Sequence, residues 1–422
     1  MSASFERGVD LLREVMDAPT AAYLSSCMSC GLCAHACLFY TETGDPKYTP
    51  IRKLEPLKRL WRQEFTLFGR LARLAGLARP LADADFARWS ELVYDSCTLC
   101  GRCSMVCPVG NDIAAMIRKI REGLAIAGHA PKGLVDATRR TIEQGSPMGI
   151  KPPAFLKVVQ HQRDDSGAEI PVDRAGSDYL VVMSSMEIVG SPEYLGALAK
   201  IFRQAGLTWT VSSTAYEATN SGIQIGVSDL AKQIVSRIVD AAETLGVKFV
   251  VSPECGHAYS ALRWEGPNLI GRPYKFRVVH VLELIDELRR AGKLRTKGTF
   301  DEPVALHDPC QIVRRGGVVE QPGTLLKAVA SKIRETEDQG MLNWCCCGGG
   351  GVSANHGAEA LRIRVFTKKK SQIEKAGVAH LVTPCGNCRN VIEEALDHYG
   401  MKVEVHGLTE LVGDHLDEGD AS

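Results

Sequence analysis

Two short runs of cysteine near the N-terminus constrain this chain more than any other feature of its sequence. They hold eight of the 15 cysteines, and both read C-x2-C-x2-C-x3-C. This spacing binds [4Fe–4S] cubanes, with three thiolates of a run on one cluster and the fourth usually on the other cluster of a pair. We therefore predict two cubanes with exchanged fourth ligands. The predicted sets are Cys27, Cys30, Cys33 and Cys107 for the first cubane, and Cys97, Cys100, Cys103 and Cys37 for the second.

Zinc is the main alternative for these thiols. Structural zinc prefers two C-x2-C pairs separated by a loop, whereas four cysteines are packed into one run here, and the pattern occurs twice. Pro108 follows the second run, as in bacterial ferredoxins, but Leu38 follows the first. The proline only shapes the turn after the last ligand, so its absence leaves the iron–sulfur prediction unchanged.

The composition narrows the class of protein further. A chain of 422 residues favours two or three domains, and 50 basic against 50 acidic residues give no preference for nucleic acid. The first residues lack the basic segment and the following apolar segment of a secretory signal peptide. No apolar stretch reaches the roughly 18 residues that a membrane span needs. Fifteen cysteines without a secretory signal favour metal ligands in a reducing cytoplasm over disulfides.

Residues 1–150 are predicted to form a mostly helical ferredoxin domain. Amphipathic helices are expected over Ser4–Met16 and Asp112–Ala127. Between the cysteine runs, Arg52–Pro80 combines many basic residues with leucines and aromatic residues at helical spacing. This segment is either an ordinary amphipathic helix packed on its own domain, or a docking surface for a partner subunit or an anionic membrane face.

The remainder of the chain has an α/β pattern. Residues 151–177 hold several prolines and glycines and are predicted to be a linker. Beyond them, short apolar runs typical of buried strands alternate with helical patterns. Strands are expected at 179–183, 248–251, 304–306 and 380–382, and helices at 229–245, 279–290 and 358–375.

This region contains an internal repeat. Val247–Pro253 matches Val378–Pro384, and each match follows a helix that ends in glycine and precedes a cysteine. Met186-Glu-Ile-Val pairs in the same way with Cys310-Gln-Ile-Val. We therefore predict an α+β multidomain protein in which two similar α/β halves, 178–300 and 301–413, follow the ferredoxin domain, with a tail at 414–422.

The second half carries another cysteine constellation. It holds Cys310, the triplet Cys345-Cys346-Cys347 before four glycines, and the pair Cys385 and Cys388. So many thiols suit a body larger than one zinc ion, although zinc or structural thiols are the alternative. Glycine lets the backbone approach such a body closely, so Gly348, Gly349 and Gly350 are predicted to contact the cofactor. A nucleotide loop is disfavoured because no Lys-Ser/Thr follows the glycines.

With these motifs the chain resembles, over residues 20–410, the D-type subunit of heterodisulfide reductases, in which a ferredoxin part precedes a cysteine-rich CCG domain. The resemblance implies a third cluster, held by Cys310, Cys346, Cys347, Cys385 and Cys388. In the family such a set holds a noncubane cluster that cleaves a disulfide in two one-electron transfers. The spacing leaves open whether this chain builds that cluster or an ordinary [4Fe–4S] cubane.

The first half departs from the two-site pattern of the family. Met186 stands where Cys310 stands, Ala215–Gly222 contains no cysteine, and Ala258 replaces the partner of Cys255. A full cluster is therefore not expected in this half. In this respect the chain looks most like the K subunit of the sulfite-reductase-associated membrane complex, whose relatives couple quinone or cytochrome partners to a disulfide or trisulfide of a small protein.

Two residues beside these motifs are candidate catalytic residues. His307 precedes Cys310 and could protonate a departing thiolate, and the alternative is a structural histidine at a strand end. Cys255 is a lone thiol that could exchange with substrate or merely line the site. Cys345 is either a reserve thiol or a buried neighbour of the ligands.

The resemblance implies an oxidoreductase subunit of sulfur metabolism. Electrons would pass through two cubanes to the CCG-bound cluster, which would reduce or oxidise a thiol–disulfide or trisulfide pair. The alternative is a pure electron relay between a flavin dehydrogenase of the glycolate or glycerol-3-phosphate type and quinone, and a zinc-dependent scaffold is a third hypothesis.

The expected partners are a membrane cytochrome b or quinone subunit, or a flavoprotein, together with a small protein or thiol substrate and no nucleic acid. The expected location is the cytoplasm, with the inner membrane face reached through a partner subunit.

Overall fold

A computed structural model of the chain describes residues 2–417. Contacts divide it into two compact units, each of which is described by itself. Unit 1 comprises residues 1–136, 222–228 and 347–368, and unit 2 comprises residues 137–221, 229–346 and 369–422. Unit 1 therefore contains both cysteine runs together with the segment that begins at Cys347.

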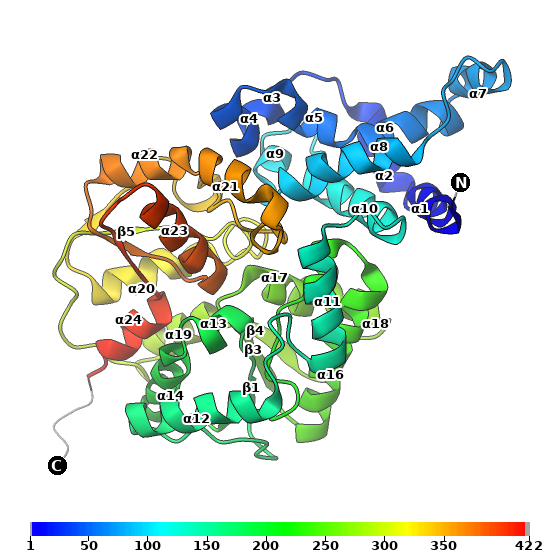
Figure 1. The fold of residues 1–422 in the computed structure, drawn as a ribbon. Helices are drawn as coiled ribbons and strands as arrows, with labels where there is room; N and C mark the ends of the chain where they lie inside the picture. The colour runs from blue at the N-terminus through cyan, green and yellow to red at the C-terminus, as the bar shows by residue number, and fades with distance from the viewer. Residues whose placement is uncertain (1, 418–422) are drawn as a thin grey trace, which may run out of the picture. The chain divides into compact units, whose positions relative to one another are not determined.

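Unit 1 is helical (Figure 1). Aspartate and serine side chains start its longer helices, because they accept hydrogen bonds from free backbone N–H groups: Ser2 caps α1, Asp17 caps α2 and Asp112 caps α10. The helices predicted at 4–16 and 112–127 are thus confirmed as α1 and α10. The elements are α1 (Ala3–Glu14), α2 (Ala18–Ser26), α3 (Leu32–His35), α4 (Leu38–Thr43), η1 (Pro46–Tyr48), α5 (Pro50–Lys53), α6 (Glu55–Leu60), η2 (Trp61–Phe65), α7 (Leu67–Leu74), α8 (Asp83–Ser90), η3 (Glu91–Asp95), α9 (Arg102–Met105), η6 (Val352–Ala354), η7 (His356–Ala358) and α21 (Glu359–Val365) besides α10 (Ile113–Ile126).

The basic segment between the cysteine runs consists of several short helices. Its first part packs inside unit 1, since Leu57 and Leu60 of α6 are fully buried. After the π-turn η2, helix α7 extends away from the remaining helices of the unit (Figure 1), and none of its residues is buried. The first part of the segment is therefore a packed helix, as one alternative has it, and the second part is an exposed amphipathic helix whose docking on a partner or a membrane remains a prediction.

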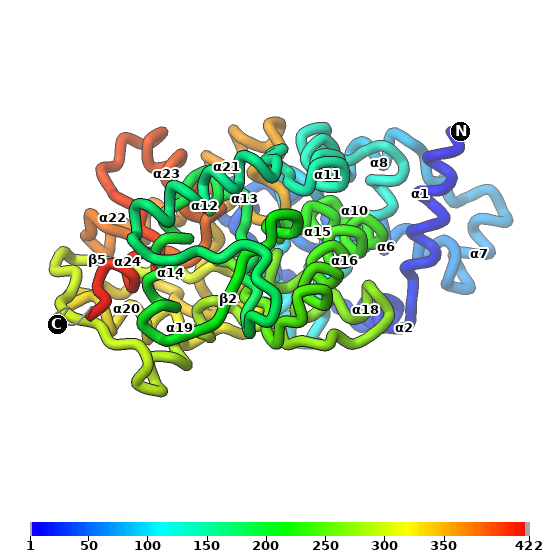
Figure 2. Tube along the Cα trace, turned by 90° about the horizontal axis from the view of Figure 1, so that it is seen from below, coloured from blue at the N-terminus to red at the C-terminus, as the bar shows by residue number. Residues whose placement is uncertain are grey.

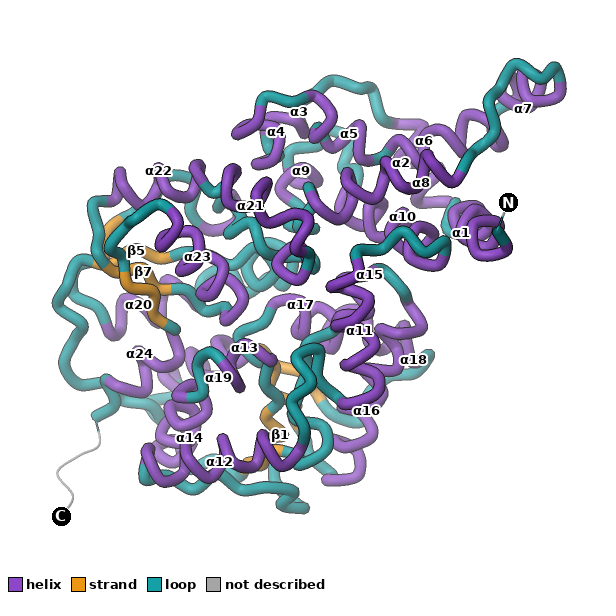
Figure 3. The backbone as a smooth tube through the Cα atoms, in the orientation of Figure 1, coloured by secondary structure: helices purple, strands orange, loops and turns teal. Residues whose placement is uncertain are grey.

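Unit 2 contains two four-stranded parallel sheets with the same topology. The strand orders are β2-β1-β3-β4 and β6-β5-β7-β8, and Figure 3 shows β5 beside β7 in the second sheet. The repeated sequences form β3 and β7, each of which lies next to the first strand of its own sheet, β1 or β5. The internal repeat is thereby confirmed. The strands are β1 (Tyr179–Val181), β2 (Trp209–Val211), β3 (Phe249–Ser252), β4 (Arg277–His280), β5 (Val304–Leu306), β6 (Ile333–Arg334), β7 (His380–Val382) and β8 (Glu404–His406).

Helices cover these sheets and four of them cross the division between the units. Those inside unit 2 are α12 (Pro152–Ser166), α13 (Ser185–Val189), α14 (Glu193–Ala205), α17 (Gly256–Tyr259), η4 (Ser260–Glu265), α18 (Gly266–Ile270), α19 (Val281–Arg290), α20 (Gln321–Val329), η5 (Gly340–Leu342), α23 (Gly386–His398) and α24 (Leu408–Asp414). The four crossing helices are α11 (Lys132–Gln144), α15 (Ser221–Ile225), α16 (Ser228–Leu245) and α22 (Thr367–Ala376).

Two expectations for this region need correction. The segment 151–177 is not an irregular linker, because Pro152 and Pro153 occupy the first turn of α12, where proline is well tolerated. Helix α12 lies beside α14 (Figures 1 and 2) and buries Phe155 and Val159. The helix expected at 279–290 begins only at Val281, since residues 277–280 form strand β4.

Candidate iron–sulfur sites

The two cysteine runs fold into the same backbone shape. In each, the residue before the second cysteine has a positive φ, 54° at Ser29 and 55° at Leu99, and so does the glycine after it, 83° at Gly31 and 74° at Gly101. A four-residue helix then carries the third cysteine, in α3 and in α9. Turns of this kind point backbone N–H groups inward and form concave anion sites, which suits a sulfide-rich cluster.

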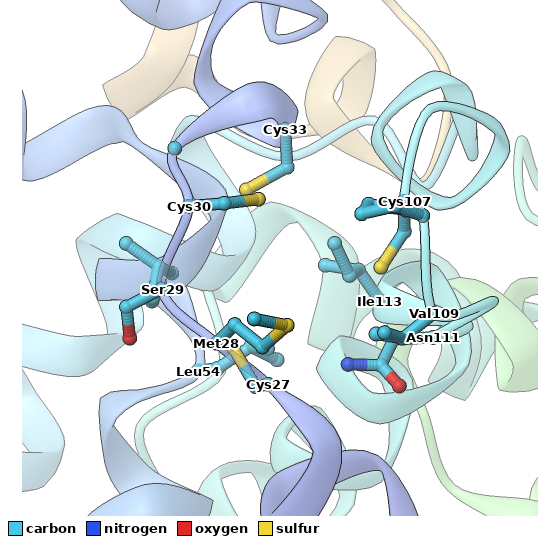
Figure 4. A pocket seen from close by; sticks show the side chains of 13 residues that line it. Cys27, Met28, Ser29, Cys30, Cys33, Leu54, Cys107, Val109, Asn111 and Ile113 are labelled. Atoms are coloured by element: carbon cyan, nitrogen blue, oxygen red, sulfur yellow. The ribbon is translucent and has the colours of Figure 1, made fainter.

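The first group of thiols surrounds one cavity. Cys27, Cys30 and Cys33 line it together with Cys107 from the other run, and Figure 4 shows Cys30 and Cys33 on one side of it and Cys107 on the other. Burial, followed by the nearby thiols of Cys27, Cys30 and Cys107, raises the pKa of the Cys33 thiol. The structure therefore brings together the four residues that the exchanged arrangement requires.

The second group has the complementary composition. Burial raises the pKa of the Cys103 thiol well above its usual value, and the nearby thiols of Cys100, Cys37 and Cys97 raise it further. Cys37 thus lies with the second run rather than with its own. Its sulfur accepts a hydrogen bond at 3.4 Å from Nζ of Lys53, a side chain that is only 2% exposed.

These groups fit iron–sulfur clusters. Four thiols that raise one another's pKa cannot all ionise in a half-buried site unless a positively charged body neutralises them, and a [4Fe–4S] cluster needs four thiolates. Ligation of each cubane by its four cysteines remains a proposal that rests on this grouping.

The glycine loop after Cys347 belongs to unit 1 and packs against the second cysteine run. A Cβ atom on Gly350 would lie 2.8 Å from the carbonyl carbon of Thr98, and its φ is 61°. Cys347 itself is fully buried and has a φ of 80°, which is unusual for a residue with a side chain. Gly350 is therefore explained by its contact with the second run, whereas cofactor contacts of Gly348 and Gly349 remain predictions.

The other cysteines of the CCG constellation lie in unit 2 and are all buried. Cys310 follows β5, and Cys385 follows β7 and occupies the N-cap position of α23, which carries Cys388 in its first turn. The Cys388 thiol donates hydrogen bonds to Cys346 and Cys385, which raises its own pKa well above its usual value and lowers that of Cys385. Cys345 is hydrogen-bonded to Cys346.

His307 lies beside these thiols. Ligand atoms of His307, Cys346 and Cys388 all lie within 4.8 Å of one another. Nδ1 of His307 lies 3.3 Å from Nδ2 of Asn343, while Nε2 has no hydrogen-bond partner among the described residues. Burial, and then the charge of Lys369, lower the pKa of His307 well below its usual value. With Nδ1 as the acceptor, the neutral ring carries its proton on Nε2.

The two halves of unit 2 pack on each other through equivalent glycines. A Cβ atom on Gly256 would lie 2.4 Å from Cβ of Gln311, next to Cys310, and one on Gly386 would lie 2.9 Å from Cβ of Met186. Cys255 precedes Gly256 at the N-cap of α17 and is buried, and the charge of Cys385 contributes to raising its pKa after burial itself. The lone thiol of the first half is therefore near the constellation of the second, although no role follows from this.

Sequence reasoning missed two buried cations of unit 1, Lys53 and Arg121. Lys53 is in helical phase with the buried Leu57 and Leu60, at positions i, i+4 and i+7. Arg121 is fully buried and is in phase with Ile117 and Leu124 of α10. A basic residue in helical phase with apolar residues indicates a buried cation that needs a partner, because such residues are almost never fully buried without one.

Comparison with known proteins agrees with this architecture. The family model for the 4Fe-4S dicluster domain matches residues 23–111, and the model for the CCG cysteine-rich domain matches residues 304–393. The Hdr-like menaquinol oxidoreductase iron-sulfur subunit of Archaeoglobus profundus is 26% identical over 97% of this chain and 82% of its own length. The D-type subunit of the dihydromethanophenazine:CoB–CoM heterodisulfide reductase of Methanosarcina acetivorans is 26% identical over 93% of this chain and 94% of its own.

Two further matches are to proteins of other kinds. The EtfAB:quinone oxidoreductase of Syntrophomonas wolfei is 25% identical over 88% of this chain and 55% of its own length. A solved glutamate racemase of Bacillus anthracis gives a TM-score of only 0.27 at 13% identity, over 57% of this chain and 80% of its own, which carries no argument.

The chain is thus an iron–sulfur electron-transfer subunit of the oxidoreductase class, with a dicluster domain before a cysteine-rich domain. More particularly, it is a CCG protein that resembles the D-type subunits of heterodisulfide reductases. The likeness to the K subunit of the sulfite-reductase-associated complex remains a prediction. Among residues 2–417, no helix is both long enough and apolar enough to cross a membrane.

Proposed function

We propose that this subunit passes electrons through two cubanes to a third, CCG-bound cluster that reduces or oxidises a disulfide or trisulfide. The observation that carries the proposal is that ligand atoms of His307, Cys346 and Cys388 lie within 4.8 Å of one another, while Cys385 is hydrogen-bonded to Cys388. The proposed ligands are Cys310, Cys346, Cys385 and Cys388, together with Cys347, which follows Cys346 in the chain. A cluster bound there would supply single electrons and a place to hold one sulfur of the substrate.

The side chains around this constellation support sulfur chemistry. A disulfide that accepts electrons leaves as thiolate, which a hydrogen bond stabilises. Nε2 of the neutral His307 has no other partner among the described residues and is suited to donate such a bond. Asn343 sets this tautomer by donating to Nδ1, and Nζ of Lys369 in turn donates to Oδ1 of Asn343 at 2.9 Å. His307 is accordingly proposed as a hydrogen-bond donor to the departing sulfur.

The test is a spectroscopic response of the third cluster to thiols. Oxidation of the holoprotein with ferricyanide in the presence of a small dithiol such as dithiothreitol should give a new paramagnetic signal, because one thiolate remains at the cluster after the first electron has left. Cys346→Ser should abolish this signal, whereas Cys27→Ser should leave it in place. If neither thiols nor disulfides nor trisulfides perturb the third cluster, the proposal is wrong.

A second candidate function is a pure electron relay. The relative named EtfAB:quinone oxidoreductase favours it, since that name contains no sulfur substrate. In this case reduced flavoprotein or menaquinol would exchange electrons with all three clusters, and thiols would leave every signal unchanged. The same set of spectra therefore separates the two functions.

The partner proposed for either function is a membrane-bound cytochrome b or quinone subunit, with a flavoprotein as the alternative. The proposed location is the cytoplasmic face of the membrane, reached through that subunit. The support is helix α7, whose leucines and Phe68 are exposed although the helix is strongly amphipathic. An unpartnered apolar face of this kind marks an interaction site.

A further inference from the structure

We infer that two buried cations, Lys53 and Arg121, raise the reduction potential of the second cubane. Arg121 also holds the glycine loop that follows Cys347 against the second cysteine run. The inference rests on the proposed function, because it takes Cys37, Cys97, Cys100 and Cys103 as the ligands of that cubane. It goes beyond that function because it states which residues determine which of the two cubanes is reduced more easily.

Lys53 places its ammonium group directly on a ligand. Its Nζ donates to Sγ of Cys37 at 3.4 Å and to the carbonyl oxygen of Ser96, one residue before Cys97. It also lies 5.0 Å from the ring centroid of Phe39. The side chain is 2% exposed, so water screens its charge weakly.

Arg121 contacts the backbone of the same cysteine run. Its guanidinium donates to the carbonyl oxygen of Cys97 at 2.6 Å and to that of Val93 at 2.7 Å. It lies over the ring of Tyr94 at 4.8 Å and is fully buried. A third carbonyl that it binds, at 2.6 Å, belongs to Gly350 in the loop after Cys347. One cation thus joins the backbone of the second cysteine run to the CCG loop.

The charge of the nearby Asp95 carboxylate partly offsets that of Arg121. Neither cation forms an ion pair with a carboxylate in the part of the chain that the structure describes; their donors face carbonyl oxygens and one sulfur. The first group of thiols offers the contrast, because none of the described residues lining its cavity carries a charged side chain. The two groups share one backbone shape but differ in electrostatics.

The physical consequence has a definite sign. A reduced cubane carries one more negative charge than an oxidised one, so a nearby cation stabilises the reduced form and raises the potential. Hydrogen bonds to ligand sulfur act in the same direction. Since Arg121 also holds Gly350, the electron is stabilised at the cubane whose cysteine run touches the loop after Cys347.

The experiment is a redox titration of the reconstituted holoprotein followed by EPR, with Cys27→Ser used to assign the signal of the first cubane. Lys53→Met should lower the electron affinity of the second cubane at least tenfold, or about 59 mV for one electron, and leave that of the first within twofold. Lys53→Arg should retain the wild-type potential. Lys47→Met is the matched control, because Lys47 is a solvent-exposed cation of the same unit.

Arg121 allows charge and geometry to be separated. Arg121→Met should lower the same potential, whereas Arg121→Lys should preserve it but speed amide hydrogen exchange at residues 347–351, because lysine cannot span the carbonyls that the guanidinium fork binds. If Lys53→Met does not fold, Lys53→Gln replaces it as the neutral variant at this position.

Three results would overturn the inference. The first is an unchanged second potential in Lys53→Met and Arg121→Met. The second is an equal shift of both cubanes, which would mean an effect of overall charge. The third is loss of the second cubane in every neutral variant, which would mean that the cations are required for cluster binding and do not tune the potential. Absence of clusters from the wild-type protein would instead refute the proposed function.

Discussion

Helix α7 offers a perturbation whose effects on folding and on docking should separate cleanly. The double variant Phe68→Ser/Leu74→Ser removes two apolar side chains that are 83% and 86% exposed. Because they bury almost nothing within the chain, the free energy of unfolding should change by no more than about 0.5 kcal/mol. If the apolar face of α7 docks on a membrane subunit, the same variant should lose most of its affinity for the membrane.

The expected loss follows from the exposed area. Complete burial of a Leu or Phe side chain is worth roughly 1.5–3 kcal/mol, and about four-fifths of each side chain remains to be buried. The two substitutions together therefore remove at most about 5 kcal/mol, which corresponds to up to roughly three thousandfold in Kd. Imperfect burial lowers this figure, so a loss of tenfold or more is expected.

The assay is a binding isotherm of the tagged protein on washed membranes of its host. Leu60→Ser is the matched control: Leu60 lies on the preceding helix but is fully buried, so its loss should cost about 2–5 kcal/mol of folding stability. Vesicles of anionic phospholipid test for direct lipid binding, and equal binding to them would contradict docking on a subunit. An unchanged isotherm for the double variant would refute the argument. Charge reversal of Arg59 would be a poorer test, because Arg59 pairs at 2.9 Å with the buried Asp85.

Three other predictions concern ligands, metal content and pH. Cys37→Ala should perturb the EPR spectrum of the second cubane and spare the first, and the opposite pattern would contradict the exchanged ligands. If each of the three sites holds four iron atoms, anaerobic analysis should find about 12 per chain with matching sulfide, whereas stoichiometric zinc with little sulfide would contradict the cluster assignment. Burial raises the pKa of Glu410 from 4.5 to about 7, so the folded state alone stays protonated between these values and stability should fall as pH rises from about 4.5 to 7. Glu410→Gln should weaken this pH dependence in denaturant melts, and an unchanged dependence would show that Glu410 is not responsible.

The cysteine spacing predicted most of what is local about the sites. A run of four cysteines needs a tight turn to bring its thiols together, and both runs adopt the same one, with positive φ at Ser29 and Leu99. The apolar periodicity of α10 and the repeated strands β3 and β7 were equally readable, because period and composition are properties of a short segment. The meeting of Cys37 with the other run could also be predicted, since the three-residue offset is a feature of the motif.

Features that depend on contacts between distant segments were not readable in the same way. The prolines and glycines at 151–177 predicted a linker, yet prolines at a first helical turn start α12, and packing against α14 stabilises it. The strands β2, β4, β6 and β8 are only two to four residues long, too short for their alternation to be distinguished. Lys53 was counted among the cations of a basic segment, although its ammonium group turns inward to Cys37.

The degenerate half of the CCG region has a structural reason to persist without ligands of its own. In unit 2, the loop that bears Cys310 packs on Gly256 of the first half, and α23, which bears Cys388, packs on the first half at Met186 through Gly386. Because each half supplies a wall for the N-terminal turn of the other's helix, the first half holds the elements that present the thiols of the second. Met186 in place of a cysteine removes a ligand but not this wall, so the cluster site of the second half still requires the fold of the first.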